Sequence, residues 1–342
     1  MEKVLQVGLI GVGSIASRRH LPAWGKEKRA EVVSISDVDI ERAKRVAARF
    51  GIKRVYEDYR EMIAKEELDI CDICTRSGTH VSVAKICLNL GVHVMSEKPM
   101  AMTYESGREL FEVIQSCPKM YTVVFNYRFS PPVIALRRLL CEGVLGEVES
   151  LRVQFGWKKP DYQDQFKEEY PNGILYETGI HDIDLCISLL GEVRKVQAYP
   201  ECTEAGATHA LTSLIEHSSG VSSKLQVCFC HPRIEHLLEI VGSKGSANID
   251  FRTLQLTTHG INHRMGVTSY LRRAFVSVKH SLRPKQFLFG GQLPFDCIVS
   301  NFVNAVLFES PLLVSPPEAF YDLRVANLLD ISTRTGEAQI IE

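Results

Sequence analysis

The stretch that decides the fold is Val-Leu-Gln-Val-Gly-Leu-Ile-Gly-Val-Gly-Ser-Ile-Ala, residues 4–16. It begins as an apolar run typical of a buried strand, and its GxGxxA falls where a helix is expected to begin. Gly11 permits a tight turn, Gly13 leaves space for a pyrophosphate, and Ala16 lets the helix pack on the strand. The helix N-terminus offers N–H groups to the phosphates. The stretch predicts a dinucleotide-binding turn; the alternative is a glycine turn that binds no nucleotide.

The composition is that of an ordinary globular protein. The chain has 342 residues, of which 45% are hydrophobic and 24% charged, enough to form two domains. With 40 basic and 41 acidic residues the formal net charge is -1, so nothing favours nucleic acid or a membrane surface as a partner. The N-terminus lacks the features of a signal peptide, and no apolar run reaches the roughly 20 residues of a membrane span. We expect a cytoplasmic protein with a small-molecule partner.

The first 125 residues alternate short apolar runs with longer amphipathic patterns, which predicts an α/β Rossmann domain with a doubly wound parallel sheet. The expected strands are 4–10, 31–36, 69–75, 92–96 and 121–126. Helices are expected over 39–51 and 79–91, each ending at a glycine. The first domain is therefore predicted to comprise residues 1–125.

Residues 126–342 are predicted to form an α+β domain with a large open, mostly antiparallel sheet, because extended runs follow one another from about residue 147. One helical stretch, 175–191, interrupts these runs. Two helices close the chain, and the C-terminal one could pack back on the first domain. The locally basic segment 259–293 is read as a solvated loop or subunit contact, with an anion-binding surface as the alternative.

Asp37 follows the predicted second strand, about 20 residues past the glycines, where a carboxylate would accept hydrogen bonds from the adenosine ribose. Its charge would repel a 2′-phosphate, so NAD is favoured as cofactor. NADP stays possible because Arg42 and Lys44 lie near enough in sequence to soften that repulsion. Asp37 could instead cap a helix, although Asp39 is better placed for that.

Ten cysteines are scattered through the chain, several of them inside apolar runs, which indicates reduced thiols rather than disulfides. Cys71 and Cys74 form a CxxC in a predicted buried strand, where alternation sends their side chains to opposite faces. Cys228 and Cys230 share a strand face, but no second ligand pair accompanies them. No metal site is predicted.

Glu97-Lys98-Pro99, directly after the predicted strand 92–96, is similar to the EKP motif of the glucose-fructose oxidoreductase, inositol dehydrogenase and MocA family. Residues 75–80 resemble the family's loop beneath the nicotinamide, residues 126–131 its interdomain segment, and residues 173–184 its catalytic helix. The likeness covers most of the chain but weakens between residues 259 and 293. The dinucleotide site that follows from the motif and the resemblance comprises Gly11, Gly13, Ser14, Ile15, Asp37, Thr75, Ser77, His80, Glu97 and Lys98.

Oxidation of a carbinol by a nicotinamide needs a group that takes the hydroxyl proton and a donor that stabilises the oxyanion. Histidine can take a proton at neutral pH, and a charged lysine can polarise the oxygen. The resemblance implies these roles for His181 and Lys98. It also makes the peptide bond before Pro99 a candidate cis bond.

Glu177, His181 and Asp184 are spaced by four and three residues, so on a helix they would project from one face and contribute to catalysis. An exposed ion pair at a helix start is the alternative. The chain has Glu177 where the family commonly has aspartate, and Arg76 where it often has proline. Arg76 could reach a phosphate or a substrate carboxylate, or simply be exposed. Tyr127, Arg128, Trp157 and Tyr176 are the candidate substrate contacts; Tyr162 and Tyr170 lie nearby in sequence, and core packing could explain each aromatic residue.

The sequence thus predicts an NAD(P)-dependent dehydrogenase or reductase that interconverts a CH–OH group and a ketone on a sugar, nucleotide-sugar or cyclitol. Two alternatives, suggested by the family, are a non-catalytic dinucleotide-sensing regulator and a glycosidase that retains its NAD. Substrate identity and reaction direction are left open. An exposed sheet face in the second domain predicts a homodimer or homotetramer.

Overall fold

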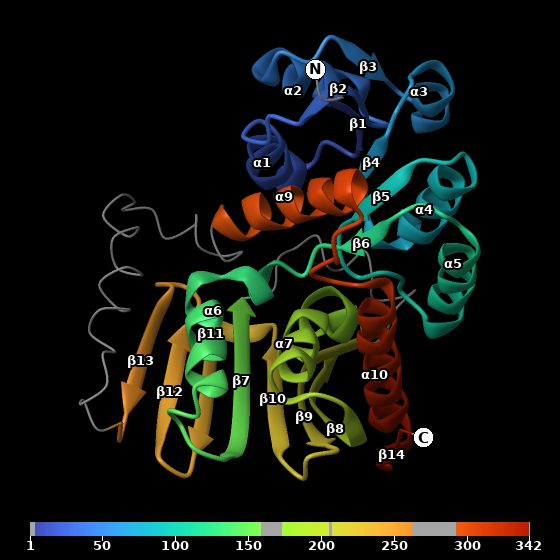
Figure 1. Ribbon diagram of the computed structural model, residues 1–342. Coiled ribbons are helices and arrows are strands. Elements are labelled where there is room, and N and C mark those ends of the chain that lie inside the picture. The colour runs from blue at the N-terminus through green and yellow to red at the C-terminus, as the bar shows by residue number, and fades with distance from the viewer. Residues whose placement is uncertain (1–3, 159–172, 205–206, 262–291, 342) are drawn as a thin grey trace. The chain divides into compact units, whose positions relative to one another are not determined.

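A computed structural model describes residues 4–158, 173–204, 207–261 and 292–341. The chain folds into two compact units (Figure 1). The first comprises Met1–Phe125 and Phe295–Arg324, and the second comprises Asn126–Pro294 and Val325–Glu342. Most of the predicted basic segment, residues 262–291, lies outside the described residues. Among the described residues, no helix has both the length and the apolar character that crossing a membrane requires.

The first unit is built on a six-stranded sheet in which every strand pair is parallel (Figure 1). Its order, β3-β2-β1-β4-β5-β6, places β1 and β4 at the centre, where the order of connection reverses. This confirms the predicted doubly wound fold, although the short strand β3 was not predicted. The strands are β1 (Leu5–Ile10), β2 (Ala30–Ser36), β3 (Arg54–Tyr56), β4 (Ile70–Ile73), β5 (His93–Ser96) and β6 (Tyr121–Val123).

Capping residues mark the ends of several helices in the first unit. Asp39 caps α2 by accepting a hydrogen bond from the backbone of Arg42, and Gly51 ends it with a φ of 74°. Asp58 and Thr103 cap α3 and α5 in the same way. The helices are η1 (Ala16–His20), α1 (Leu21–Trp24), α2 (Ile40–Phe50), α3 (Tyr59–Lys65), η2 (Ser77–Thr79), α4 (His80–Asn89), α5 (Tyr104–Ser116) and most of α9 (Leu293–Phe308).

The second unit contains an eight-stranded sheet with the order β13-β12-β11-β7-β10-β9-β8-β14. Strands β7 and β10 pair in parallel, and every other described pair is antiparallel, which confirms the predicted mostly antiparallel sheet. The short strands β13 and β14 were not predicted. The strands are β7 (Val148–Lys158), β8 (Val193–Glu204), β9 (Ala207–His217), β10 (Ser222–Cys228), β11 (Cys230–Gly242), β12 (Gly245–Asp250), β13 (Gln255–His259) and β14 (Gln339–Ile340).

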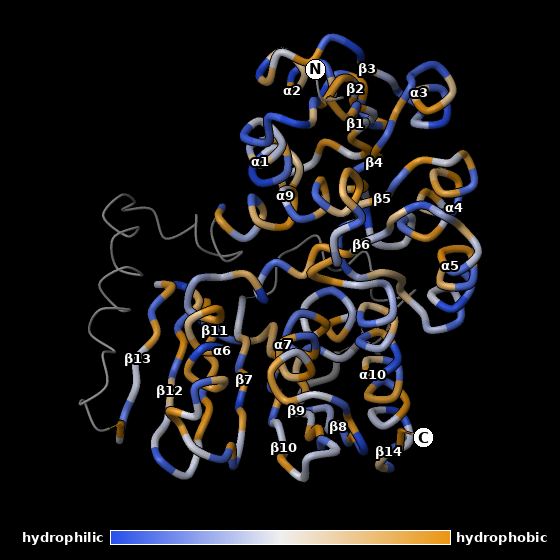
Figure 2. Tube along the Cα trace, viewed as in Figure 1, coloured by the Kyte–Doolittle hydropathy of each residue, from blue (hydrophilic) through white to orange (hydrophobic). Residues whose placement is uncertain are grey.

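Helices cover one face of this second sheet. Figure 1 shows α6 (Pro131–Cys141) and α7 (Ile180–Leu190) across it, and the last turns of α10 (Pro316–Thr335) reach β8, where Ser332 accepts a hydrogen bond from the backbone of Ala198. Along β10 and the second half of β11 buried residues alternate with more exposed ones, and Figure 2 shows hydrophobic and hydrophilic colours along the same strands. The other face leaves large apolar side chains exposed: Tyr199, Leu214 and Leu237.

Candidate active site

The turn after β1 has the geometry that the glycine motif predicts. Gly11 has a φ of 87°, and a Cβ there would lie 2.8 Å from the carbonyl of Cys74, so only glycine fits. A Cβ on Gly13 would meet nothing within 4 Å, which leaves open space beside the backbone. Ala16 is fully buried, Ser14 is exposed and Ile15 is half-buried. The turn can therefore hold a pyrophosphate against its backbone.

The helix after this turn starts with a π-helical turn, η1, instead of the regular helix expected from the motif. π-turns occur mostly as single turns at functional sites. Here the π-turn ends at His20, whose buried imidazole contacts Asp72 on β4 and Glu97 after β5. Sequence reasoning gave His20 no role.

Asp37 directly follows β2 and is held rigidly. Its carboxylate accepts hydrogen bonds from the backbone N–H groups of Val12, at 2.8 Å, and Asp39, at 2.9 Å. Arg42 donates to both of its oxygens, at 2.5 and 3.2 Å. Burial works to raise the pKa of Asp37, but the hydrogen bonds from Arg42 and the two backbone groups outweigh burial and lower it. The carboxylate is ionised and lies at the strand end, where the motif predicts a ribose contact.

Arg42 occupies two of the roughly four acceptor positions of the Asp37 carboxylate, and backbone groups occupy the others. Ribose hydroxyls could bind Asp37 only if the Arg42 side chain, which is 43% exposed, swings aside. Lys44, which lies near enough in sequence to soften the same repulsion, pairs with Glu41. Its influence on the choice between NAD and NADP stays a prediction.

The loop after β4 and the EKP turn after β5 are joined by His80. Its Nδ1 lies 2.8 Å from the carbonyl oxygen of Pro99, and its Nε2 lies 3.2 Å from that of Thr75. The ring is buried, as is Ser77, whereas Thr75 is half-buried and Arg76 exposed. His80 therefore ties the two loops together; its contact with a cofactor stays a prediction.

Lys98 lies at the carboxyl edge of the parallel sheet, directly after β5 and half-buried. Ligands of open α/β sheets bind outside this edge. The peptide bond between Lys98 and Pro99 is cis, as the resemblance implied. Glu97, the first residue of the motif, is buried, and its carboxylate points inward to His20 at 2.8 Å.

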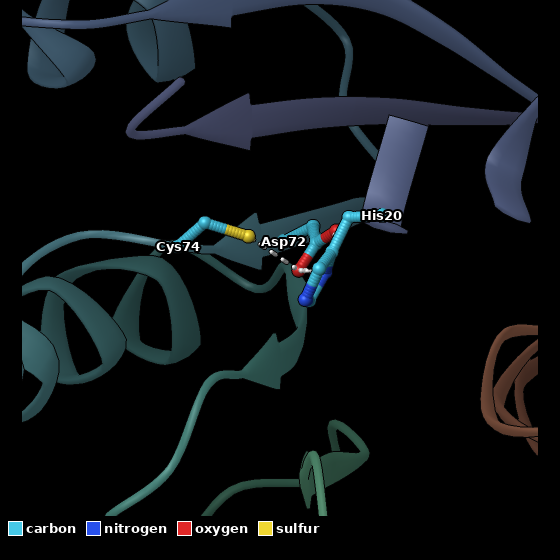
Figure 3. A group of neighbouring side chains, drawn as sticks. All are labelled: His20, Asp72 and Cys74. Carbon is cyan, nitrogen blue, oxygen red and sulfur yellow. Dashed lines mark hydrogen bonds and ion pairs between the residues drawn. The ribbon is translucent and has the colours of Figure 1, made fainter. Parts of the chain in front are cut away.

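A buried polar cluster lies behind this edge. Figure 3 shows three of its members, His20, Asp72 and Cys74, whose possible ligand atoms all lie within 4.8 Å of one another. Glu97 and Trp24 complete it. A charged residue inside the apolar run 69–75 was the available signal, because a buried carboxylate requires a partner. Sequence reasoning gave Asp72 no role.

The cysteine motif does not act as a pair. The thiol of Cys71 is associated with Cys87, and this hydrogen bond together with burial raises the pKa of Cys71. The thiol of Cys74 instead lies 3.6 Å from Asp72, and burial with the Asp72 charge raises its pKa well above the ordinary range. Both thiols are therefore protonated and unreactive.

In the second unit, α7 carries His181 and is preceded by a π-helical turn, η5 (Leu175–Gly179). The ring of His181 is 9% exposed and meets Tyr127 edge-on, with ring centroids 4.9 Å apart. Asp184 accepts a hydrogen bond from Nε of Arg128 at 2.6 Å, and both side chains are buried. Residues 126–129 form the short helix η3, so this segment holds α7 at two points.

Asp182 makes a further contact that the sequence did not suggest. Its Oδ1 lies 2.8 Å from Nε2 of His236 on β11, and both residues are buried. The ring of His236 also meets Tyr127 edge-on, at 4.7 Å, and stacks on Phe251 at 4.3 Å. Tyr127 thus lies against both histidines. The partners come from distant segments, and no local pattern could have paired them.

The predicted common face of Glu177, His181 and Asp184 was based on an unbroken α-helix, whereas Glu177 lies inside the π-helical turn η5. His181 and Asp184 both lie on α7 and keep their i,i+3 relationship. Glu177 is half-buried, and its catalytic role stays a prediction.

The candidate substrate contacts differ in burial. Tyr127, Arg128 and Tyr176 are buried, and Arg128 is engaged by Asp184, whereas Trp157 near the end of β7 is half-buried. Tyr162 and Tyr170 lie outside the described residues.

Comparison with known proteins supports the reading of both units. Residues 5–125 match the model of the oxidoreductase family with an NAD-binding Rossmann fold, and residues 133–248 match the GFO/IDH/MocA C-terminal domain. The chain is 29% identical to D-apiose dehydrogenase of Paraburkholderia graminis over 71% of this chain and 68% of the relative. It is also 29% identical to D-glucoside 3-dehydrogenase of Escherichia coli over 57% of each.

Solved structures share the fold. The WlbA dehydrogenase of Bordetella pertussis, solved with NADH and UDP-GlcNAcA, has a TM-score of 0.87 at 22% identity, covering 100% of this chain and 99% of that one. Levoglucosan dehydrogenase, solved with NADH and L-sorbose, has a TM-score of 0.85 at 19% identity, covering 99% of each chain. With both domain models matched in order, the chain belongs to the GFO/IDH/MocA family of NAD-binding oxidoreductases.

Proposed function

We propose that this dehydrogenase interconverts a CH–OH group and a ketone on a sugar, nucleotide-sugar or cyclitol. The observation that carries the proposal is the place of Lys98, half-buried at the carboxyl edge of the NAD-binding sheet on a turn held by His80. The relatives named for D-apiose and D-glucoside oxidation support the substrate class.

The residues of the first unit fit the cofactor. The open space at Gly13 accommodates a pyrophosphate, and Asp37 accepts the ribose hydroxyls once Arg42 has moved. The bound nicotinamide supplies the hydride acceptor or donor. Lys98 donates a hydrogen bond to the carbinol or ketone oxygen and stabilises the negative charge that develops there.

His181 exchanges the hydroxyl proton. In oxidation its neutral ring takes the proton, and in reduction the protonated ring returns it. Tyr127 holds the ring edge-on, while Arg128 and His236 fix α7 through Asp184 and Asp182. A ring that is held in one orientation needs little rearrangement for proton transfer.

The test is a spectrophotometric screen of the purified protein with NAD and a panel of aldoses, glycosides, nucleotide sugars and cyclitols. Lys98→Met and His181→Ala are expected to lower kcat on the order of 10²–10⁴-fold, because each removes a group that acts in the transition state. Lys85→Met, at an exposed ion pair with Glu109, and His217→Gln, at a buried histidine, are the matched controls.

Full turnover by His181→Ala would remove its proposed role. Release of an aglycone from a nitrophenyl glycoside without accumulation of NADH would replace the proposal with the NAD-retaining glycosidase. If no polyol or keto-sugar changed the nicotinamide absorbance, the proposed substrate class would be wrong.

A further inference from the structure

His20 lies between two carboxylates in the interior of the first unit. Its Nδ1 is 2.8 Å from Oδ2 of Asp72, and its Nε2 is 2.8 Å from Oε1 of Glu97. The three residues are 1%, 0% and 8% exposed, so water does not screen them. The histidine comes from η1, Asp72 from β4, and Glu97 directly follows β5.

The two contacts favour the doubly protonated ring. A neutral imidazole carries one N–H and one lone pair, so one of its nitrogens would face a carboxylate oxygen with no proton between them, unless that carboxyl group were itself protonated. The doubly protonated ring donates to both carboxylates. We propose that His20, as an imidazolium, is a positioning residue for the turn that carries Lys98. The kinetic part of this inference rests on the proposed function, but the protonation does not.

The surrounding groups favour the charged ring. Burial works to lower the pKa of His20, but the interactions of the ring with Asp72 and Cys74 together outweigh burial and raise it well above its ordinary value. Burial also works to raise the pKa of Glu97, and the hydrogen bond and charge of His20, with the charge of Lys98, lower it. The other groups around the ring are the Trp24 indole, the Cys74 thiol and the ring of Phe295 from α9.

The path from His20 to Lys98 is short. One oxygen of Glu97 binds His20, and the other accepts a hydrogen bond from the backbone N–H of Lys98 at 3.2 Å. At the other end of the turn, the carbonyl of Pro99 is bound by His80. The turn is thus held at both ends, and His20 holds the end next to Lys98.

A metal ion is a less suitable occupant of the same cluster. Both ring nitrogens of His20 already face carboxylates, and the indole N–H of Trp24 donates to Oδ2 of Asp72 at 2.7 Å. This oxygen therefore already engages both the indole of Trp24 and the ring of His20, which uses its two lone-pair positions. A metal would also require the Cys74 thiolate, which burial and Asp72 disfavour.

The first test is ¹⁵N NMR of the imidazole rings in the wild-type protein with and without NADH. Both nitrogens of His20 are expected to stay protonated through neutral pH into the alkaline range. His217 is an internal contrast: burial lowers its pKa, and its ring faces the Gly191 carbonyl and the Ser223 hydroxyl. A neutral His20 ring at neutral pH, or one equivalent of tightly bound zinc by elemental analysis, would overturn the proposal.

The second test uses the variants His20→Gln, Glu97→Gln and the double variant, with His217→Gln as the matched control. His20→Gln is expected to lower kcat on the order of 10²-fold and to move its pH profile while NADH binding largely persists, because only the Lys98 turn is displaced. The kcat of the double variant should be only slightly below that of the less active single variant, since both residues act through one contact. Additive losses, or a pH profile that is lowered without moving, would assign His20 a purely structural role.

The proposed function and the proposed charge of His20 can fail separately. If no sugar is oxidised but the ring of His20 is doubly protonated, the proposed function fails and the charged bridge stands. If sugars are oxidised but His20 is neutral, the function stands and the bridge fails. The wild-type spectrum requires no variant to fold.

Discussion

The guanidinium of Arg128 donates from Nε to Oδ1 of Asp184 over 2.6 Å, with both side chains buried. Removal of Arg128 would take a charge partner away from the buried Asp184, so Arg128→Ala should lower the free energy of unfolding by about 3–5 kcal/mol. Denaturant unfolding measures the loss. Arg194→Ala, at the exposed pair with Glu216 in the same unit, should change it by less than about 1 kcal/mol.

Replacing both partners, with Arg128→Met and Asp184→Leu together, should restore part of that stability, because both buried charges of the pair are then removed. A double variant that is less stable than either single variant would contradict this expectation. It would show that the ion pair itself stabilises the fold more than the apolar side chains that replace it.

Cofactor choice should depend on the Asp37–Arg42 pair. Arg42→Ala should strengthen NADH binding, because the carboxylate no longer has to exchange the guanidinium for ribose hydroxyls. Asp37→Ser should weaken NADH binding and improve NADPH binding, because the released Arg42 can bind the 2′-phosphate. Fluorescence titration with both cofactors measures the ratio of the NADH and NADPH affinities. Lys44→Ala, which removes a pair with Glu41, should leave this ratio unchanged. An unaltered ratio in Asp37→Ser would show that another contact sets the preference.

Stability should fall on both sides of neutral pH for different reasons. The pKa values of Asp37 and Glu97 are lowered by folding, so the stabilisation they provide is present above their unfolded values near 4 and is lost as the pH falls through the folded values. The pKa of His20 is raised, so its stabilisation is complete below about 6.5 and is lost as the pH rises through the folded value.

Melting temperature against pH, measured for the wild type and His20→Gln, separates these effects. The fall in melting temperature at alkaline pH should be smaller in the variant than in the wild type. The part of this fall that is due to buried thiols such as Cys186, whose pKa is also raised, is common to both proteins. Equal alkaline slopes in the two proteins would show that His20 does not carry the expected charge.

Self-association is expected through the face of the eight-stranded sheet that α6 and α7 leave uncovered. Tyr199 and Leu214 are 50% and 46% exposed there, and an apolar sheet face of this kind pairs readily with a copy of itself. Leu214→Asp should shift the mass measured by light scattering from a dimer or tetramer to a monomer. Leu90→Asp, at an exposed leucine after α4, is the control. A wild-type monomer at micromolar concentration would contradict the prediction.

Local chemistry made the strands and turns of the first unit predictable. Gly11, Gly51 and Gly91 have the positive φ that their places in the pattern require, and Asp39 caps its helix. The edge strands β3, β13 and β14 escaped prediction because they are short and exposed, so their hydrophobic pattern is weak.

The site was predictable only where a motif carried it. Lys98 and His181 were found because they lie in motifs that resemble those of the family. The partners of His20 and Asp182 lie at least 52 residues away in the sequence, so only tertiary packing brings them together. The π-turns at η1 and η5 were also missed, because each spans only five residues, too few for the apolar pattern to show a change of period.

The chain returns to the first unit with Phe295–Arg324 after building most of the second. On the ribosome, the NAD-binding sheet therefore emerges long before the segment that supplies Phe295 to His20 and the carbonyl of Val314 to Thr122. The first unit is complete only after Arg324 has been added, and no single cut in the chain separates the two units. In evolution, the two units would be expected to be inherited together, because a fragment exchanged at residue 125 would leave the first one without its α9 cover.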